Sequence, residues 1–160
     1  MREIEFRAKS FVNDGWQWVY GYYAPVYLFE KDGEENHTYC IVSDKCIGRT
    51  EMLGCGVQSG LPAHYLIRQE TLGQFTGLKD KNGVKVYEGD IVRVYTDCEY
   101  YVEKGYHNGV IIFDDEYFFD YQVSFEHIHN SCSDYLGNHR DDIEVVGNVY
   151  DNPELIKESE

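Results

Sequence analysis

The sequence lacks any apolar run approaching the ~18 residues that a bilayer-spanning segment needs. Its first residues include Glu3 and Glu5, where a secretory signal would be apolar. We therefore expect no membrane segment and a cytoplasmic location. The five cysteines are odd in number, irregularly spaced and without a CxxC pair, so they indicate neither a disulfide framework nor a thioredoxin-like motif.

Basic residues are also scarce, with 14 Lys and Arg against 29 Asp and Glu and a formal net charge of −15. Residues 97–160 hold 16 acids and 3 bases, net −13, whereas residues 1–96 hold 13 acids and 11 bases, net −2. This balance argues against a general binder of nucleic acid or anionic membranes. Direct nucleic-acid binding is not expected, because the candidate basic patch is small: Lys79, Lys81, Lys85 and Arg93.

Established catalytic motifs are missing as well: the sequence contains no P-loop, GxGxxG, GxSxG or HExxH motif and no EF-hand spacing. The adjacent acids Asp114-Asp115-Glu116 and Asp141-Asp142 point to opposite faces if they lie on strands, so they do not converge without a turn. We expect no catalytic residues and no cofactor. An enzyme with a nonstandard site stays open as an alternative.

What the sequence does contain is alternation with a period of two, the pattern of strands with one buried face. Trp16, Trp18, Tyr20 and Tyr22 would project to one side of such a strand as an aromatic ladder. Further runs rich in β-branched and aromatic residues predict six more strands. They cover residues 38–43, 64–68, 90–95, 109–113, 117–125 and 143–150.

Turn signals separate these runs. Asn82-Gly83 predicts a tight type I′ hairpin, because both residues tolerate positive φ angles. Gly89 in Glu88-Gly89-Asp90 predicts a turn or bulge before the next strand. Helical signals are limited to a short C-terminal turn that begins at Pro153, with Asn152 as a candidate cap. Residues 45–62 hold four glycines without a clear period, which indicates a long loop.

Two sequence blocks carry a family resemblance. Residues 71–92, TLGQFTGLKDKNGVKVYEGDIV, resemble the central signature of the YopX family of small bacteriophage and prophage proteins. Residues 143–155, IEVVGNVYDNPEL, resemble its C-terminal signature, and residues 4–8 and 18–22 resemble its N-terminal pattern. The resemblance implies a phage or prophage protein in the cytoplasm of a host bacterium. It implies no reaction and no catalytic residues.

The order of strands and turns predicts a mostly β (α+β) fold of antiparallel strands with a small SH3-like or Greek-key barrel at about residues 72–150. The expected division is an N-terminal β subdomain with the Gly/Cys loop, residues 1–71, and a barrel subdomain with a short C-terminal helical turn, residues 72–160. Residues of the family motifs are expected to shape turns, bulges and close backbone contacts. They are Gly77, Asn82, Gly83, Gly89, Asp90, Gly147, Asn148 and Pro153.

Histidines and a cysteine gather in one region. His127, His129, Cys132 and His139 carry imidazole and thiolate groups, which suit zinc. Their spacing, HxHxxC-x6-H, matches no established zinc pattern. The metal site is one hypothesis, and ordinary surface or interface histidines are the alternative.

Tyrosine is unusually abundant, with 15 residues. The aromatics of the second part exceed what one face of a small barrel can bury, so some should reach the surface and contact other polypeptides. The candidate interface tyrosines are Tyr95, Tyr100, Tyr101, Tyr106, Tyr117 and Tyr121. The expected function is a phage accessory role through association with a protein partner or with itself as a homo-oligomer. The alternatives are an acidic DNA mimic that inhibits a host DNA-binding protein, or a metal-dependent enzyme.

Overall fold

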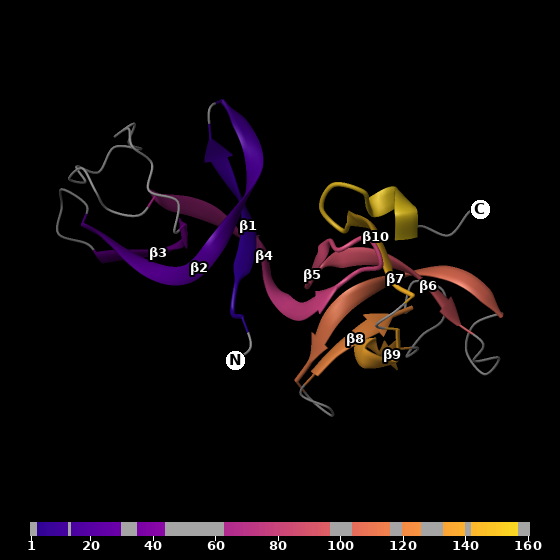
Figure 1. The fold of residues 1–160 in the computed structure, drawn as a ribbon. Helices are drawn as coiled ribbons and strands as arrows, with labels where there is room; N and C mark the ends of the chain where they lie inside the picture. The colour runs from indigo at the N-terminus through magenta and orange to yellow at the C-terminus, as the bar shows by residue number, and fades with distance from the viewer. Residues whose placement is uncertain are drawn as a thin grey trace. The chain divides into compact units, whose positions relative to one another are not determined.

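The computed structural model describes residues 3–12, 14–29, 35–43, 63–96, 104–115, 120–125, 133–139 and 142–156 (Figure 1). The first strands are β1 (Phe6–Val12), β2 (Gly15–Phe29), β3 (Glu35–Ser43), β4 (Ala63–Lys79) and β5 (Lys85–Tyr87). The remaining elements are β6 (Asp90–Thr96), β7 (Gly105–Asp114), β8 (Asp120–Ser124), β9 (Ser133–Tyr135), the 3₁₀ helix η1 (Leu136–His139), β10 (Glu144–Asn148) and the 3₁₀ helix η2 (Pro153–Ile156).

The fold class predicted from the alternation is confirmed: the chain is mostly β and its sheets are antiparallel. The described residues contain no α-helix, so the α part of the expected α+β class is reduced to the two 3₁₀ helices. The predicted C-terminal turn is one of these, and it begins at Pro153 as expected. Residues 45–62, the predicted long loop, lie outside the described residues.

The chain forms two compact units. The N-terminal unit comprises Ile4–Gln74, and the C-terminal unit comprises Phe75–Glu160 together with Met1–Glu3. Strand β4 runs from the first unit into the second, so the boundary between residues 71 and 72 that the sequence suggested falls inside a continuous strand.

In the N-terminal unit, β2 pairs with β1 and β3, and β4 pairs with both β3 and β1. The buried side consists of Ala8, Val19 and Ile41, against which half-buried side chains pack. Those half-buried side chains are Phe6, Val12, Tyr23, Tyr65, Ile67 and Leu72. Alternation along β1 and β2 therefore sends the opposite set of side chains away from this core.

A close backbone contact ties β2 to β3. A Cβ atom on Gly21 would overlap the carbonyl oxygen of Val42. Tyr22 and Val42 are register partners, so Gly21 lies where β2 leaves β1 and joins β3. Only a residue without a side chain allows this approach.

The C-terminal unit has a five-stranded sheet in the order β10-β6-β7-β8-β9. Strands β6, β7, β8 and β9 pair one after another as a meander, and β10 pairs with the other edge of β6. The last strand of this sheet in the chain, β10, therefore lies beside the first, β6. The core of the unit is made by Val86, Val92, Val94, Ile111, Tyr121, Val123, Phe125, Leu136 and Ile143.

The turn between β4 and β5 differs from the type I′ hairpin that Asn82-Gly83 predicted. Gly83 has a φ of 82°, but Asn82 is not among the residues with positive φ. The Gly83 N–H donates to the Asp80 carbonyl, and the Asp80 N–H donates to the Val84 carbonyl. This pattern is a type I turn followed by a glycine bulge. The type I′ prediction was wrong because it left out Asp80, whose carboxylate binds the turn from within.

The other motif residues shape turns and bulges. Gly77 and Gly89 have positive φ angles of 88° and 79°. The Asp90 carboxylate accepts the Tyr87 N–H at 2.8 Å, which closes the turn before β6. The register of β10 shifts between Val145 and Gly147, and a Cβ on Gly147 would come within 2.6 Å of the Asn152 side chain.

Asn148 stabilises the turn that follows β10. Its side-chain oxygen accepts the N–H groups of Tyr150 and Asp151, both at 3.0 Å. The expected side-chain cap of η2 by Asn152 is not the contact observed: its side-chain oxygen accepts the Asn148 N–H at 3.4 Å, and its backbone carbonyl accepts the Leu155 N–H.

Candidate interaction surface

The outward side of β1 and β2 carries a row of large aromatic side chains. Ala8 and Val19 are register partners in the core, so their neighbours along each strand point the other way. Trp16 is 52% exposed and Tyr22 is 62% exposed, and Phe11 and Tyr20 are exposed as well. The Phe11 and Trp16 rings meet edge to face with centroids 5.6 Å apart. Aromatic side chains are thus displayed rather than buried along this strand pair.

Cationic side chains lie against the two tryptophans. The guanidinium carbon of Arg7 is 4.6 Å from the Trp18 ring centroid, and the Lys9 Nζ is 5.5 Å from the same centroid. The guanidinium carbon of Arg68 on β4 is 5.1 Å from the Trp16 ring centroid. Each distance lies within the ~6 Å over which a cation is attracted to an aromatic ring.

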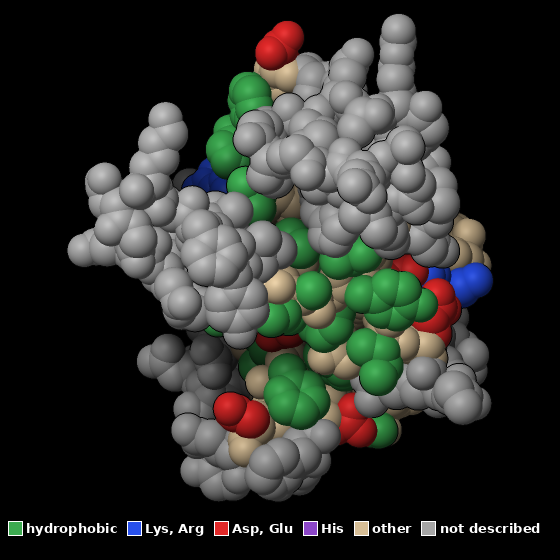
Figure 2. All heavy atoms as spheres, turned by 90° about the vertical axis from the view of Figure 1, so that its left-hand side faces the viewer, with side chains coloured by type: hydrophobic (Ala, Val, Ile, Leu, Met, Phe, Trp, Pro, Cys, Tyr) green, Lys and Arg blue, Asp and Glu red, His purple; other side chains and the backbone are tan. Residues whose placement is uncertain are grey.

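We call this surface the aromatic–cation face and define it by seven residues from three strands. They are Arg7, Lys9, Phe11, Trp16, Trp18, Tyr20 and Arg68. The pairing of β1 with both β2 and β4 brings them together, since Lys9 has Trp18 and Arg68 as its two register partners. Figure 2 shows one side of the molecule, where hydrophobic side chains of the described residues gather.

The edge of the aromatic–cation face carries a carboxylate. Glu70 forms an ion pair with Arg68 at 2.6 Å between Oε1 and Nη2. A hydrogen bond from its own backbone N–H and another from Arg68 lower the pKa of Glu70. The pair is well exposed to solvent, so it orients the Arg68 side chain more than it stabilises the fold.

A hollow of about 420 Å³ lies in the same unit. Its lining includes Val12, Val19 and Tyr65 of the core side, together with polar groups of Glu5 and Gln17. Core-side residues thus form part of this lining, so the hollow is not counted as part of the aromatic–cation face.

Sequence reasoning had located the aromatic ladder but not the cations. Arg7, Lys9 and Phe11 also alternate with a period of two, and this alternation was the available signal for β1. No local pattern places Arg68 beside Trp16, because the two residues meet only through the β1–β4 and β1–β2 pairings.

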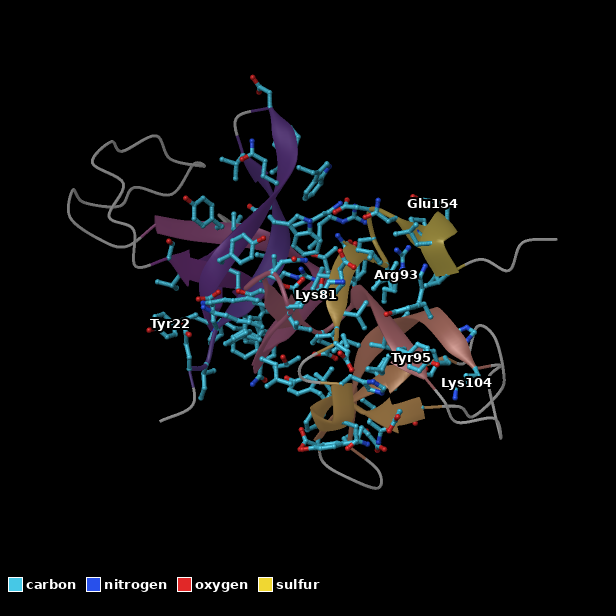
Figure 3. All side chains as sticks on the ribbon, turned by 45° about the vertical axis from the view of Figure 1, so that its right-hand side comes forward. Tyr22, Lys81, Arg93, Tyr95, Lys104 and Glu154 are labelled. Atoms are coloured by element: carbon cyan, nitrogen blue, oxygen red, sulfur yellow. The ribbon has the colours of Figure 1, made fainter. Side chains whose placement is uncertain are left out.

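The candidate interface tyrosines of the C-terminal unit separate into different environments. Tyr95 and Tyr106 are register partners on β6 and β7, and their rings lie edge to face 5.3 Å apart. Tyr106 is 70% exposed, and Figure 3 labels Tyr95. Tyr121 is only 3% exposed and belongs to the core, so its prediction as an interface residue was wrong. Tyr100, Tyr101 and Tyr117 lie outside the described residues.

The metal hypothesis concerns mostly undescribed positions: His127, His129 and Cys132 lie outside the described residues. His139 is buried, and its Nε2 lies 2.9 Å from an oxygen of Asp134. Within the parts of the chain that the structure describes, no group of three or more His, Cys, Asp or Glu side chains could hold a metal ion. The structure thus places His139 beside the Asp134 carboxylate. The metal site formed by the four residues stays a hypothesis.

The basic residues of the expected nucleic-acid patch are partly engaged in ion pairs. Lys81 contacts Glu144 at 2.7 Å, and Lys85 contacts Glu3 at 2.9 Å. The hydrogen bond from Lys81 lowers the pKa of Glu144, and Arg93, its register partner, contributes to the same shift. Figure 3 labels Lys81 and Arg93. Lys81, Lys85 and Arg93 thus each have a carboxylate beside them.

Two further titratable groups are shaped by burial. Burial raises the pKa of the Cys40 thiol, which keeps it protonated and unreactive. Burial also raises the pKa of Tyr23, and the neighbouring Tyr39, whose ring stacks at 5.1 Å, adds to the shift. Tyr23 packs against the core of the N-terminal unit, and Cys40 is buried within the same unit.

Comparison with known proteins places the chain in a family. A family model described as YopX protein matches residues 11–157, nearly the whole sequence. The chain belongs to the YopX family. Among curated proteins no match is found. Among solved structures, the crystal structure of protein EF1440 from Enterococcus faecalis is similar, with a TM-score of 0.45 and 22% identity over 98% of this chain and 100% of that one. No described helix is long and apolar enough to span a membrane.

Proposed function

We propose that this YopX-family chain is an accessory protein that acts by binding polypeptides through its aromatic–cation face. Exposed tryptophan and tyrosine are the residues that contribute most to protein interfaces, because each buries a large rigid area at little entropic cost. The proposal also places the protein in the cytoplasm of a bacterium that carries a phage or prophage. That part rests on the motif resemblance noted above.

The single observation that carries the proposal is the position of the exposed Trp16 and the half-buried Trp18, with arginine and lysine, on one surface. Trp16 is 52% exposed although its neighbour Phe11 is apolar too. A side chain at the rim of a monomer's core would turn its ring toward that core. Instead, the core of the unit lies on the other side of β2, where Val19 is buried. Contiguous exposed apolar surface of this kind is typical of interaction sites.

The composition of the face favours a protein partner over nucleic acid. Stacking platforms for single strands combine aromatics with a positively charged groove. Here Glu70 borders Arg68, and the whole chain carries −15. The field of the molecule therefore opposes the approach of a polyanionic backbone, whereas a polypeptide can match aromatic, cationic and acidic groups locally.

Site-specific photocrosslinking tests the proposal. A photoreactive phenylalanine derivative replaces Tyr22, which continues the row of exposed aromatics along β2 and is 62% exposed. The matched control carries the same group at Val84, an exposed hydrophobic residue of the C-terminal unit. Irradiation of bacteria that produce each variant should give polypeptide adducts at position 22 and not at position 84.

The adducts are separated by mass and identified by peptide sequencing. Adducts at position 22 that contain this chain or another defined polypeptide support the proposal. Equal labelling at both positions, or no adduct at position 22 when the chain is folded and abundant, overturns it.

A further inference from the structure

We propose that Asn82 is a site of spontaneous modification, at which the side-chain amide is lost when the β4–β5 turn opens and aspartate or isoaspartate is left. The inference goes beyond the proposed function, because it concerns the C-terminal unit and depends on no partner. It starts from the two Asn-Gly pairs of the chain, Asn82-Gly83 and Asn108-Gly109. Valine follows both pairs, so they share one chemistry, but they lie in different local structures.

The reaction needs only the chain and water. The Gly83 nitrogen attacks the carbonyl carbon of the Asn82 side chain, and its proton passes through solvent to the side-chain nitrogen, which leaves as ammonia. The five-membered imide that results then takes up one water molecule. Opening at the side-chain carbonyl gives aspartate, whereas opening at the main-chain carbonyl gives isoaspartate. A glycine in the second position favours the attack, because no side chain shields its nitrogen.

The closed turn keeps Asn82 from reacting. The Gly83 N–H donates to the Asp80 carbonyl at 2.9 Å, so the attacking nitrogen is held in the hydrogen bond that closes the turn. Asn82 is the third residue of this type I turn, a position where ψ is about 0°. At that angle the Gly83 nitrogen lies in line with the backbone nitrogen of Asn82 and away from its side chain. The ring can therefore form only after the turn opens.

The Asp80 carboxylate controls that opening. Its Oδ1 accepts the N–H groups of Asn82 and Val84, both at 2.8 Å. Its Oδ2 accepts the Val145 N–H at 3.1 Å and so ties the turn to β10. Hydrogen bonds to a charged group are the stronger ones in proteins. Loss of this carboxylate therefore shifts the turn toward its open form and releases the backbone around Asn82.

The modification adds negative charge where acids already lie. The pKa of Glu144 is lowered mainly by the hydrogen bond from Lys81 and, more weakly, by one from the Asn82 side chain. Aspartate at position 82 replaces this donor with a carboxylate that repels Glu144 and Asp80. Isoaspartate in addition lengthens the main chain within the turn. Both products therefore weaken the turn, and a closed turn that reacts once does not form again as before.

Asn108 has the same successor but lies inside a sheet. It belongs to β7 and is the register partner of Arg93 on β6. Its side chain donates to the Leu155 carbonyl at 2.9 Å, and Gly109 is buried. Reaction here requires β7 to separate from its neighbours. The β4–β5 turn, in contrast, is exposed from residue 81 to residue 84, and exposed segments of this kind open locally at a lower cost in free energy.

Peptide mapping by mass spectrometry tests the inference with the purified full-length chain, incubated at neutral pH. The conversion rates of Asn82 and Asn108 are measured side by side, in buffer and in denaturant, and chromatography separates the aspartate and isoaspartate peptides. Asp80→Ala removes the carboxylate that holds the turn. Asp115→Ala, which removes an exposed carboxylate, is the matched control. Circular dichroism reports whether each variant is folded.

In buffer we expect Asn82 to convert at least ~10-fold faster than Asn108, because its turn opens locally. In denaturant Asn82 should convert faster than in buffer, and the two rates should agree within about twofold, since neither asparagine is protected in an unfolded chain. Asp80→Ala should raise the rate at Asn82 by ~5–30-fold, the factor by which the loss of such hydrogen bonds changes an opening equilibrium. Asp115→Ala should leave both rates unchanged.

Equal rates at Asn82 and Asn108 in buffer would overturn the inference, and so would a rate at Asn82 that is as high in buffer as in denaturant. A folded Asp80→Ala variant in which Asn82 reacts no faster than in wild type, or an Asp115→Ala variant in which it reacts as fast as in Asp80→Ala, would also overturn it. If Asp80→Ala unfolds, both asparagines react faster together, and the comparison of Asn82 with Asn108 in the wild-type chain decides.

Discussion

The Trp18 indole carries two cations, with the guanidinium carbon of Arg7 at 4.6 Å and the ammonium of Lys9 at 5.5 Å from its centroid. Arg7 is buried in the unit although its group is charged. The indole therefore both holds the cation in place and forms part of the displayed surface. This one ring therefore contributes both to the stability of the β1–β2 pair and to the surface of the aromatic–cation face.

A double-mutant cycle measures that coupling. Arg7→Met and Trp18→Leu keep apolar volume and remove the cation or the ring. We expect a coupling free energy of about 0.5–2 kcal/mol in denaturant unfolding, the range for cation–π contacts between exposed and desolvated sites. The fluorescence of Trp16 remains as the probe in all four proteins. Additive effects would contradict the contact.

Asp80 stabilises the turn between β4 and β5 and ties it to β10. Its Oδ1 accepts the N–H groups of Asn82 and Val84, both at 2.8 Å, and its Oδ2 accepts the Val145 N–H at 3.1 Å. In Asp80→Asn an amide N–H would face the Val145 N–H, so we expect a loss of about 1–3 kcal/mol in unfolding free energy. Asp115→Asn, at an exposed position, is the control and should have little effect.

The same carboxylate predicts a pH dependence. Burial alone would raise the pKa of Asp80, but hydrogen bonds from Val84, Val145 and Asn82 outweigh it and hold the pKa below the ordinary value of 3.8. The unfolded chain thus binds a proton first as the pH falls. The stabilisation that the ionised Asp80 contributes is fully present above pH ~4, and it is lost as the pH falls through the lower pKa of the folded state. When the unfolding free energy is plotted against pH, Asp80→Asn should lack the part of the slope that this carboxylate contributes. A slope equal to that of wild type would show that Asp80 is not the group responsible.

Two glycines of β2 make a matched pair. A Cβ on Gly21 would overlap the Val42 carbonyl oxygen, whereas a Cβ on Gly15 would meet nothing within 4 Å. We expect Gly21→Ala to lower the unfolding free energy by about 1–3 kcal/mol, as overpacking does. Gly15→Ala should leave it within about 0.5 kcal/mol, as at an open surface position. Equal thermal melting shifts for the two variants would contradict the observed β2–β3 approach.

Local alternation was enough to predict most of the fold. The runs at residues 38–43, 64–68, 90–95, 109–113, 117–125 and 143–150 all overlap observed strands. The strand of residues 6–12 was not predicted, although it organises the face, because Arg7 and Lys9 alternate with Ala8 and Ser10 and give a weak apolar pattern. The turn type was also predicted wrongly, because the group that determines it, the Asp80 side chain, lies before the Asn-Gly pair.

The candidate site was less accessible from sequence. The ladder from Trp16 to Tyr22 was recognised, but alternation does not say which side of a strand faces the core. The abundance of tyrosine predicted an interface in the C-terminal unit, where Tyr121 is in fact buried, and not on β1 and β2. The decisive contact, Arg68 over Trp16, joins residues far apart in the chain and depends on strand pairing alone.

The two tryptophans of the chain both lie on the aromatic–cation face, so their fluorescence reports on that surface directly. The most direct test is acrylamide quenching, measured for the free chain and for the associated species, whether oligomer or complex with another polypeptide. Binding through the face predicts that association lowers the quenching constant, and that Arg68→Glu retains the value of the free chain under the same conditions. A quenching constant that stays the same on association would show that the face remains open to solvent and would contradict the account.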